Sequence, residues 1–188
     1  DRKLYGVMTK EGKWLLPCCF TEYKAPSEGV VIMAVQNSSI SDRYYKYFSM
    51  IDGNELFNTS FMKADPFKNG KARVGWLHDE YDLDLQGNVV IDENERWLLG
   101  TWVSTVDALG YSKIRFTPGG NVALSFYAPY SSYSYGGGYG TFTAKRNSVT
   151  LILDGSPEYC EVISPTSMMM GKHRLTKIED YKESPKSK

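Results

Sequence analysis

The chain has 188 residues, which is enough for one large domain or two small ones. Its 22 lysine and arginine residues balance 22 aspartate and glutamate residues, so the formal net charge is zero. No overall field therefore favours nucleic acid, an acidic substrate or an anionic membrane. No apolar run approaches the ~20 residues that a membrane helix needs. We expect neither a nucleic-acid partner nor a membrane-spanning helix.

Aromatic residues are frequent, with 14 Tyr and 8 Phe, and Val, Ile and Thr fill the remaining apolar runs. This balance favours strands and predicts an all-β protein. The pattern changes at residues 97–102, because widely spaced turn glycines precede this stretch and short alternating strands follow it. We place a β-hairpin repeat domain at residues 1–95, a second domain at 96–181 and a disordered tail at 182–188.

An internal repeat runs through the first domain, with glycines as its register marks. One spacing of 41 residues recurs in three pairs: Gly12 and Gly53, Phe20 and Phe61, Gly29 and Gly70. A half-copy at 85–91 ends the array. Glycine supplies the positive φ of a tight turn, so we expect hairpins that turn at Glu11-Gly12, Asp52-Gly53 and Gln86-Gly87. Repeats of this size bury a face only by stacking.

The first copy resembles the WG-type β repeat of bacterial proteins. The resemblance rests on Tyr5-Gly6, on Gly12-Lys13-Trp14-Leu15-Leu16-Pro17 and on Ser27-Glu28-Gly29. The second copy departs from the pattern, because Phe48 stands in the place of glycine and an insert at 38–43 lengthens one link. The resemblance implies surfaces for protein contacts and no chemistry.

After residue 100 the strands follow one another closely. About eight are predicted in up-and-down order, which is typical of a small closed β-barrel without free edges. The segment Leu99–Trp102, the turn Phe116–Gly120 and the strand Gly140–Phe142 resemble bacterial lipocalin-like domains. That resemblance implies that the Gly-x-Trp sequence closes the barrel, with Trp102 across the base of the core.

Eight strands enclose either packed side chains or one small lipophilic ligand. The side chains expected to face the interior are Trp102, Phe116, Leu124, Phe126, Phe142, Leu151, Cys160 and Val162. With so many large residues inside short strands, we favour a packed core.

The tyrosine-rich segment 127–139 is the most unusual part of the chain. It joins two predicted strands, so we expect a long loop at one end of the barrel. A tyrosine offers a flat apolar face and a hydroxyl, which fits a lid that stacks on a lipid head group or a sugar. The alternative is a hairpin whose tyrosines cover the barrel end or pack on the first domain. The candidate ligand-binding residues are Tyr127, Tyr130, Tyr133, Tyr135, Tyr139, Phe116 and Phe126.

Sequence motifs for metal binding or catalysis are weak in this chain. The sequence Asp82-Leu83-Asp84-Leu85-Gln86-Gly87, followed by Glu93, fits an EF-hand calcium loop except at Gln86. Because Gly87 is also a repeat turn and no helical pattern precedes it, we interpret the segment as structural. His78 and His173 lie near no catalytic motif. We expect no metal, no cofactor and no enzymatic activity.

The three cysteines allow at most one disulfide, from Cys18 or Cys19 to Cys160. We favour three buried thiols instead. The chain starts at Asp1 rather than at Met, so we expect it to be the processed part of a longer precursor that is exported to the periplasm, the cell surface or the medium.

Three classes of function remain open. A protein-interaction scaffold predicts a packed barrel and an exposed aromatic patch on the repeats, drawn from Trp14, Tyr23, Tyr44, Tyr45 and Trp76. A binder of small lipophilic molecules or of carbohydrate predicts a cavity bounded by the tyrosine-rich segment. An enzyme predicts carboxylates and a histidine in one cleft. We favour a non-catalytic protein whose repeats contact a protein partner and whose barrel is available to a small ligand.

Overall fold

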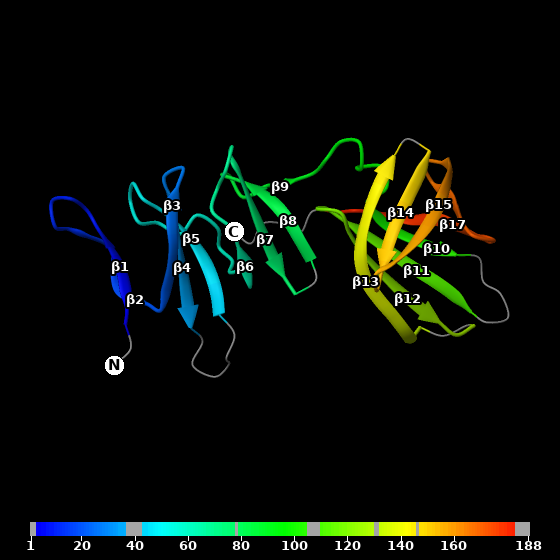
Figure 1. The fold of residues 1–188 in the computed structure, drawn as a ribbon, viewed down its shortest axis with the longest axis horizontal. Coiled ribbons are helices and arrows are strands. Elements are labelled where there is room, and N and C mark those ends of the chain that lie inside the picture. Colours follow the sequence, from blue (N-terminus) through cyan, green and yellow to red (C-terminus); the bar gives the residue numbers. More distant parts are fainter. Residues whose placement is uncertain are drawn as a thin grey trace. The chain divides into compact units, whose positions relative to one another are not determined.

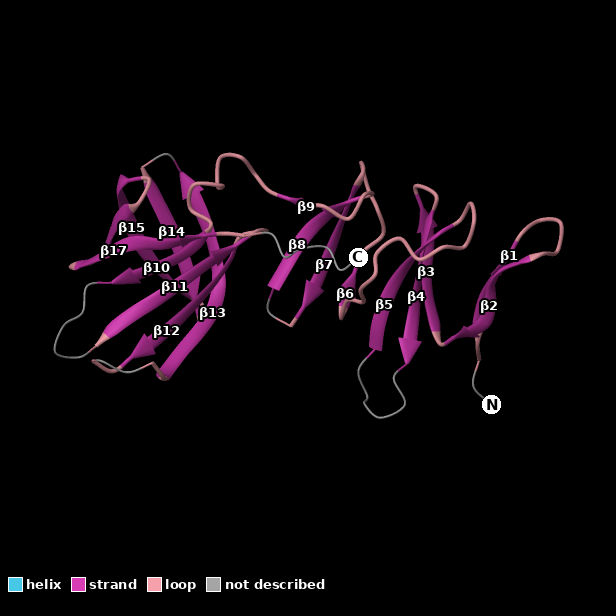
Figure 2. Ribbon diagram, turned by 180° about the vertical axis from the view of Figure 1, so that it is seen from behind, coloured by secondary structure: helices cyan, strands magenta, loops and turns pink. Residues whose placement is uncertain are grey.

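The computed structural model describes residues 3–36, 43–77, 79–104, 110–129, 132–145 and 147–182. These residues form strands and loops, with no helix among them (Figure 2). The predicted all-β class is confirmed. The chain divides between Val90 and Ile91 into two compact units, each with its own core.

The first unit contains three small antiparallel sheets, here called the first, second and third layers (Figure 1). The first layer is β1 (Tyr5–Met8) and β2 (Trp14–Phe20). The second layer is β3 (Glu22–Ser27), β4 (Val30–Gln36) and β5 (Arg43–Ser49). The third layer is β6 (Lys63–Ala64), β7 (Lys71–Trp76), β8 (Asp79–Asp84) and β9 (Val89–Val90).

The turns of this unit lie at the glycines that mark the sequence repeat. Gly12, Gly53 and Gly87 have φ angles of 83°, 75° and 77°, a region that disfavours a side chain. Asp84 stabilises the last of these turns, because its Oδ1 accepts hydrogen bonds from the backbone N–H groups of Gln86 (2.9 Å) and Asn88 (2.7 Å). The repeat in the sequence is therefore a repeat in the structure.

Backbone contacts recur with the same period. The N–H of Thr21 donates to the carbonyl of Ala34 at 3.3 Å, and one repeat later Met62 donates to Gly75 at 3.0 Å. Side chains of the first copy also bond to the backbone near the matching positions of the second. These bonds are Lys24 Nζ to Ala64 O (2.5 Å), Ser27 Oγ to Phe67 O (2.5 Å) and Gly70 N to Glu28 Oε2 (2.9 Å).

Two apolar clusters hold the three layers together. The cluster between the first and second layers contains Leu16, Phe20, Val31, Met33 and Phe48. The cluster between the second and third layers contains Val30, Ile32, Tyr47, Phe57, Phe61, Ala64, Phe67, Ala72, Val74 and Leu83. Residues of β4 belong alternately to the two clusters, so both faces of this strand are buried. Each layer thus buries its apolar face against a neighbour, as stacked repeats do.

The second unit is a closed antiparallel barrel of eight strands in sequence order (Figure 1). The strands are β10 (Gly100–Ser104), β11 (Tyr111–Thr117), β12 (Asn121–Tyr127), β13 (Ser134–Lys145), β14 (Ser148–Leu153), β15 (Ser156–Ser164), β16 (Ser167–Met170) and β17 (His173–Asp180). Pairing of β10 with β17 closes the barrel. The predicted up-and-down barrel is confirmed.

Trp102 anchors the barrel core. Its side chain is fully buried, and its indole Nε1 donates to the carbonyl of Leu98 at 2.8 Å. The rings of Trp97 and Phe116 approach it edge-on, with centroids 6.4 and 6.3 Å away. Lys177, whose side chain is only 8% exposed, places Nζ 6.0 Å from the Trp102 ring and donates to the Trp97 carbonyl at 2.8 Å. Two hydrogen bonds therefore join the residues preceding β10 to the core, and a cation–π contact links β17 to Trp102.

Candidate interaction surfaces

The tyrosine-rich segment is mostly strand, and the prediction of a long loop is wrong. β12 continues to Tyr127 and β13 begins at Ser134, opposite it, so only residues 128–133 connect them. Gly136, Gly137 and Gly138 belong to β13 and pair with the end of β12, so they do not form a flexible loop. The reason is close backbone approach, because a Cβ on Gly137 would lie 2.3 Å from the carbonyl oxygen of Leu124.

The candidate tyrosines do not converge on one cavity. Tyr133, Tyr135 and Tyr139 are 84%, 66% and 57% exposed. Tyr127 is half-buried and stacks on Tyr111, with centroids 4.8 Å apart and an interplanar angle of 6°. Tyr130 lies outside the described residues. These tyrosines occur along an outer part of β12 and β13 and in their connection.

The two candidate phenylalanines lie in different surroundings. Phe116 is fully buried and packs edge-on against Phe142, with centroids 5.2 Å apart, and against Trp102. Phe126 is half-buried and stacks on Tyr135 at 6.3 Å and 26°. Any molecule held at the centre of the barrel would have to displace Phe116.

Exposed aromatic residues do occur on the repeat unit. Trp14, Tyr23 and Trp76 are 53%, 51% and 45% exposed. Tyr45, in contrast, packs against the cluster between the second and third layers and has Lys24 Nζ 5.0 Å from its ring centroid. The candidates drawn from the sequence thus separate into three exposed side chains, one core-packed side chain and Tyr44.

Tyr44 and Trp76 form the first of two exposed surfaces. Their rings are stacked, with centroids 5.4 Å apart and an interplanar angle of 20°. Val35, 36% exposed, lies opposite Tyr44 in the β4–β5 pairing, and Leu77, 70% exposed, follows Trp76. We call these four residues the Trp76 surface. The stack joins a residue of the second layer to one of the third.

The second exposed surface lies on the first layer, and we call it the hairpin surface. Leu4, Met8 and Trp14 are 43%, 47% and 53% exposed, and Met8 lies opposite Trp14 in the pairing of β1 with β2. Sequence reasoning missed Leu4 and Met8. A single sequence carried no signal for their exposure, because apolar residues at strand ends are also typical of a core.

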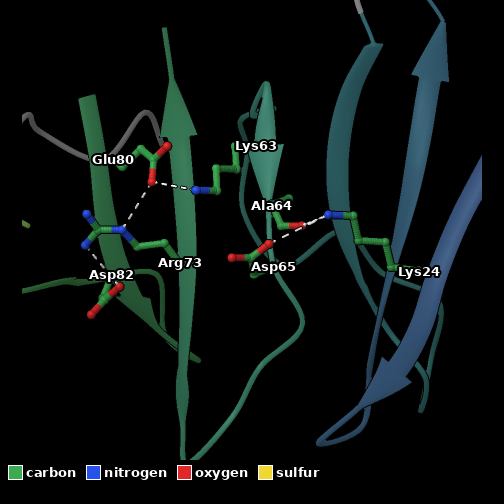
Figure 3. A network of polar contacts seen from close by, with 7 residues as sticks. All are labelled: Lys24, Lys63, Ala64, Asp65, Arg73, Glu80 and Asp82. Carbon is green, nitrogen blue, oxygen red and sulfur yellow. Dashed lines mark hydrogen bonds and ion pairs between the residues drawn. The ribbon is translucent and has the colours of Figure 1, made fainter. Parts of the chain in front are cut away.

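Charged residues occupy the face of the third layer opposite its core (Figure 3). Lys63 Nζ lies 2.7 Å from Glu80 Oε2, and Arg73 contacts Glu80 at 3.6 Å and Asp82 at 3.4 Å. The hydrogen bond from Lys63 holds the pKa of Glu80 below its usual value. Arg73 stands one repeat after Ile32, which is a core residue of the second layer. The third layer therefore has the polar outer face of a capping repeat.

The EF-hand-like residues are used in ordinary structural contacts. Asp82 pairs with Arg73, Asp84 accepts the turn hydrogen bonds, and Glu93 binds Arg96 at 2.8 Å. Within the described ranges, no group of three His, Cys, Asp or Glu side chains is arranged to hold a metal. His173 lies opposite Met170 in the pairing of β16 with β17, and His78 lies outside the described residues.

The exposure of the cysteines differs from the prediction of three buried thiols. Cys18 and Cys19 are exposed, Cys160 is buried, and all three are free thiols. The prediction of three buried thiols is therefore wrong for Cys18 and Cys19. Proline and two cysteines occupy the exposed part of β2, whereas Leu16 and Phe20 supply its buried positions. Burial raises the pKa of the Cys160 thiol to about 11.

Two pockets that the sequence did not indicate open beside Trp97. One, of about 350 Å³, is lined by residues that include Leu99, Lys177 and Tyr181. The other, of about 820 Å³, lies between residues 92–95 and 162–165. In the first pocket the ammonium of Lys177 is already engaged, because Asp180 Oδ1 lies 2.6 Å from it. This pairing holds the pKa of Asp180 below its usual value.

Together these features define an all-β protein with a capped stack of repeat layers and a closed, side-chain-filled barrel. Comparison with known proteins finds no matching family model and no matching curated protein. Among the described residues, no helix has the length and apolar character required to cross a bilayer. The exposed surfaces are therefore the features of this protein from which its function is inferred.

Proposed function

We propose that this protein is a non-catalytic interaction module, in which the repeat unit contacts a protein partner and the barrel serves as a packed scaffold. The observation that carries the proposal is the exposure of Trp14, Tyr23 and Trp76 on a unit that has two buried clusters of its own. Exposed Trp and Tyr side chains are the residue types most enriched where binding energy concentrates.

Trp14 is not required by the repeat fold. One repeat later the matching position holds Glu55, which forms an ion pair with Lys46 at 2.8 Å. The same backbone position thus accepts a charged residue. The half-exposed Trp14 ring, which lies opposite the exposed Met8, is therefore available for a contact with another molecule.

The barrel core supports a scaffold rather than a carrier. Twelve buried residues between Leu98 and Leu175, each at most 4% exposed, form one continuous apolar cluster. Trp102, Phe116 and Phe142 occupy its centre with edge-on ring contacts. A barrel of this size holds either side chains or a ligand, and here side chains fill it.

We further infer that the repeat unit is of the WG type and that the barrel is lipocalin-like. The first inference is supported by Tyr5-Gly6, Trp14 and Pro17 within one hairpin. The second is supported by Gly100-Thr101-Trp102 at the start of β10, where Gly100 has a φ of 127° and Trp102 enters the core.

Binding of a carbohydrate or another flat ligand is a second candidate. It is favoured by the three exposed tyrosines Tyr133, Tyr135 and Tyr139, which fall within seven consecutive residues. Tyrosine rings of this kind combine an apolar face with a hydroxyl. The site would lie on the outside of β13 and not in the barrel interior.

The first test uses the immobilised full chain to isolate a partner from an extract of the organism that makes it. We expect Trp14→Ala and Trp76→Ala each to weaken binding of that partner by about tenfold or more, as interface anchors do. Ile51→Ala is the matched control, because Ile51 is 89% exposed and lies outside both surfaces. Equal binding by all variants would contradict the proposal.

A thermal-shift screen of oligosaccharides, fatty acids and sterols separates the two candidates. A ligand at about 100 times its dissociation constant stabilises by ~2.7 kcal/mol. A shift that is lost in Tyr135→Ala and Tyr139→Ala would favour the second candidate. A shift that persists in those variants but is lost when the barrel core is altered would indicate an interior ligand and would contradict the packed scaffold.

A further inference from the structure

The smaller of the two pockets beside Trp97 lies on the second unit, and we call it the Lys177 pocket. It has a volume of about 350 Å³, and its lining residues come from the segment before β10 and from β17 and the residue after it. Trp102, Phe116 and Phe142, which fill the centre of the barrel, are not among them. The pocket is therefore separate from the packed barrel interior, and its volume is within the usual range of small-molecule sites.

Apolar and aromatic side chains form one part of the lining. Ile91, Trp97 and Tyr181 are partly buried and pack against the barrel core. Leu99 is 2% exposed. The Trp97 indole is held in place, because its Nε1 donates to the carbonyl of Asn94 at 2.9 Å. Walls of this kind are typical of a site that holds the apolar body of a small molecule.

The lining also contains a buried ammonium group. The side chain of Lys177 is only 8% exposed, and its Nζ donates to the carbonyl of Trp97 at 2.8 Å. Lysine is rarely buried to this extent without an anionic partner, because removal of its charge from water costs free energy. The anion here is the carboxylate of Asp180, whose Oδ1 lies 2.6 Å from Nζ.

A β-bulge places this ion pair on one face of β17. In the pairing with β10, Lys177 lies opposite Trp102 and Asp180 lies opposite Gly100. Two residues separate the β10 positions and three separate those of β17, so β17 contains one extra residue. Without the bulge, the side chains of Lys177 and Asp180 would point to opposite faces of the strand. Bulges commonly re-aim side chains at functional sites.

Asp180 is a replaceable partner for the buried ammonium. Its side chain is 85% exposed, and the hydrogen bond from Lys177 is the main cause of its lowered pKa. An ion pair with so exposed a carboxylate contributes little to stability. Arg96, the other cation of the lining, is held by two contacts of 2.8 Å with Glu93. Lys177 is therefore the group on which one carboxylate can exchange for another.

We propose that the Lys177 pocket binds a small carboxylic acid with an apolar body. The ligand carboxylate replaces that of Asp180 on Lys177 Nζ, and the apolar body lies against Trp97, Leu99 and Tyr181. A water molecule takes up about 30 Å³, so about 350 Å³ accommodates about a dozen non-hydrogen atoms. This size fits a medium-chain fatty acid or a short acid with a phenyl group, and it is too small for a sterol. The site is independent of the repeat surfaces proposed to contact a protein.

The test titrates octanoate and hydrocinnamate into the full chain by isothermal calorimetry. We expect a dissociation constant of ~1 mM or tighter for at least one of the two acids. The matching alcohols, octanol and hydrocinnamyl alcohol, should bind about tenfold more weakly or not at all, because they lack the charge-assisted bond to the ammonium. Tighter binding of octanoate identifies an aliphatic acid as the preferred ligand, and tighter binding of hydrocinnamate identifies an aromatic one.

Variants connect the binding to the ion pair. Asp180→Ala removes the competing carboxylate at an exposed position and should tighten binding of the acid by about two- to fivefold. Glu161→Ala, which removes an exposed carboxylate from β15, is the matched control and should leave the affinity unchanged. Lys177→Met removes the charge and should weaken binding by about tenfold or more. Thermal melting shows that each variant is folded.

A substitution in the barrel centre separates this pocket from an interior site. Phe116→Leu alters the centre of the core and should leave the affinity for the acid unchanged, because Phe116 does not line the pocket. Loss of binding in folded Phe116→Leu would place the ligand inside the barrel and contradict the proposal.

Other results would also overturn it. These are the absence of binding by both acids, equal binding of acids and alcohols, and an affinity that Asp180→Ala lowers or leaves unchanged.

Discussion

At the scale of single residues, Trp102 shows how one side chain joins two parts of the barrel. Its ring fills the core between Trp97 and Phe116, while its Nε1 satisfies the carbonyl of Leu98 in the segment before β10. Lys177, from the last strand, reaches both the ring and the carbonyl of Trp97. The first and last strands, which must meet to close the barrel, therefore share one buried contact.

Trp102→Ala is expected to destabilise the barrel by ~3 to 5 kcal/mol, as truncation of a large core side chain leaves a cavity. The loss of the Leu98 hydrogen bond and of the Lys177 contact adds to the effect. Urea unfolding of the full chain measures the change. Ile152→Ala, at a position 45% exposed on β14, is the control and should change stability by less than about 0.5 kcal/mol. An unchanged midpoint for Trp102→Ala would contradict its role in the core.

At the scale of elements, β13 shows that glycines can build a strand. A Cβ on Gly140 would lie 1.9 Å from the carbonyl oxygen of Ile152, and one on Gly137 would lie 2.3 Å from that of Leu124. These distances are too short for any side chain. The strand can thus pair with β12 on one side and β14 on the other only because these residues are glycines.

Gly140→Ala is expected to destabilise the barrel by ~1 to 3 kcal/mol, the usual cost of overpacking. Gly136→Ala is the matched control in the same strand, because its Cβ would meet the nearest atom, Cδ2 of Phe126, at an ordinary 3.8 Å. Thermal melting of the two variants gives the comparison. Equal melting temperatures would show that β13 can accommodate a Cβ at position 140, despite the short distance to the carbonyl oxygen of Ile152.

The sequence predicted these elements unevenly. Gly12, Gly53 and Gly87 were located as turns because a tight turn depends on neighbouring residues alone. The run Gly136-Gly137-Gly138 was misread as loop, because its strand character comes from pairing with residues 124–126 of β12 and not from the glycines themselves. Local signals identify turns, whereas a glycine strand is specified by its neighbours in the sheet.

At the scale of the whole molecule, the three thiols report separately on the two units. Cys18 and Cys19 are exposed in the first unit, and Cys160 is buried in the second, where burial raises its pKa to about 11. At pH 8 nearly all of Cys160 is therefore protonated, and the thiol is the unreactive form. Labelling with a thiol reagent should consume two thiols quickly and the third only when the barrel opens.

Trp102→Ala should accelerate the slow labelling phase and leave the two fast thiols unchanged, because the substitution raises the population of open barrel. The number of thiols that react in each phase and the rate of the slow phase are measured together. Three fast thiols in the unaltered chain would contradict the burial of Cys160. If Trp102→Ala leaves the rate of the slow phase unchanged, labelling of Cys160 does not require opening of the core.

The aromatic residues of the first unit show the limit of sequence reasoning about the site. Trp14, Tyr23 and Trp76 were identified as candidates, and all three are exposed. Tyr45 was an equal candidate by residue type but packs on the core. Leu4 and Met8 were not identified, because their residue types and positions are equally typical of a buried strand end.

The amino-acid sequence alone was sufficient to predict the all-β class, the positions of the repeat turns and the order of the eight barrel strands. Each of these depends on short-range patterns, namely turn glycines and the alternation of apolar residues. Tertiary packing decided which faces remain exposed. Ile32 and Arg73 occupy matching repeat positions, yet one lies between two layers and the other forms ion pairs on an outer face. Whether a layer receives a neighbour is a property of the stack, and for this reason the charged outer face at Arg73 became visible only in the folded chain.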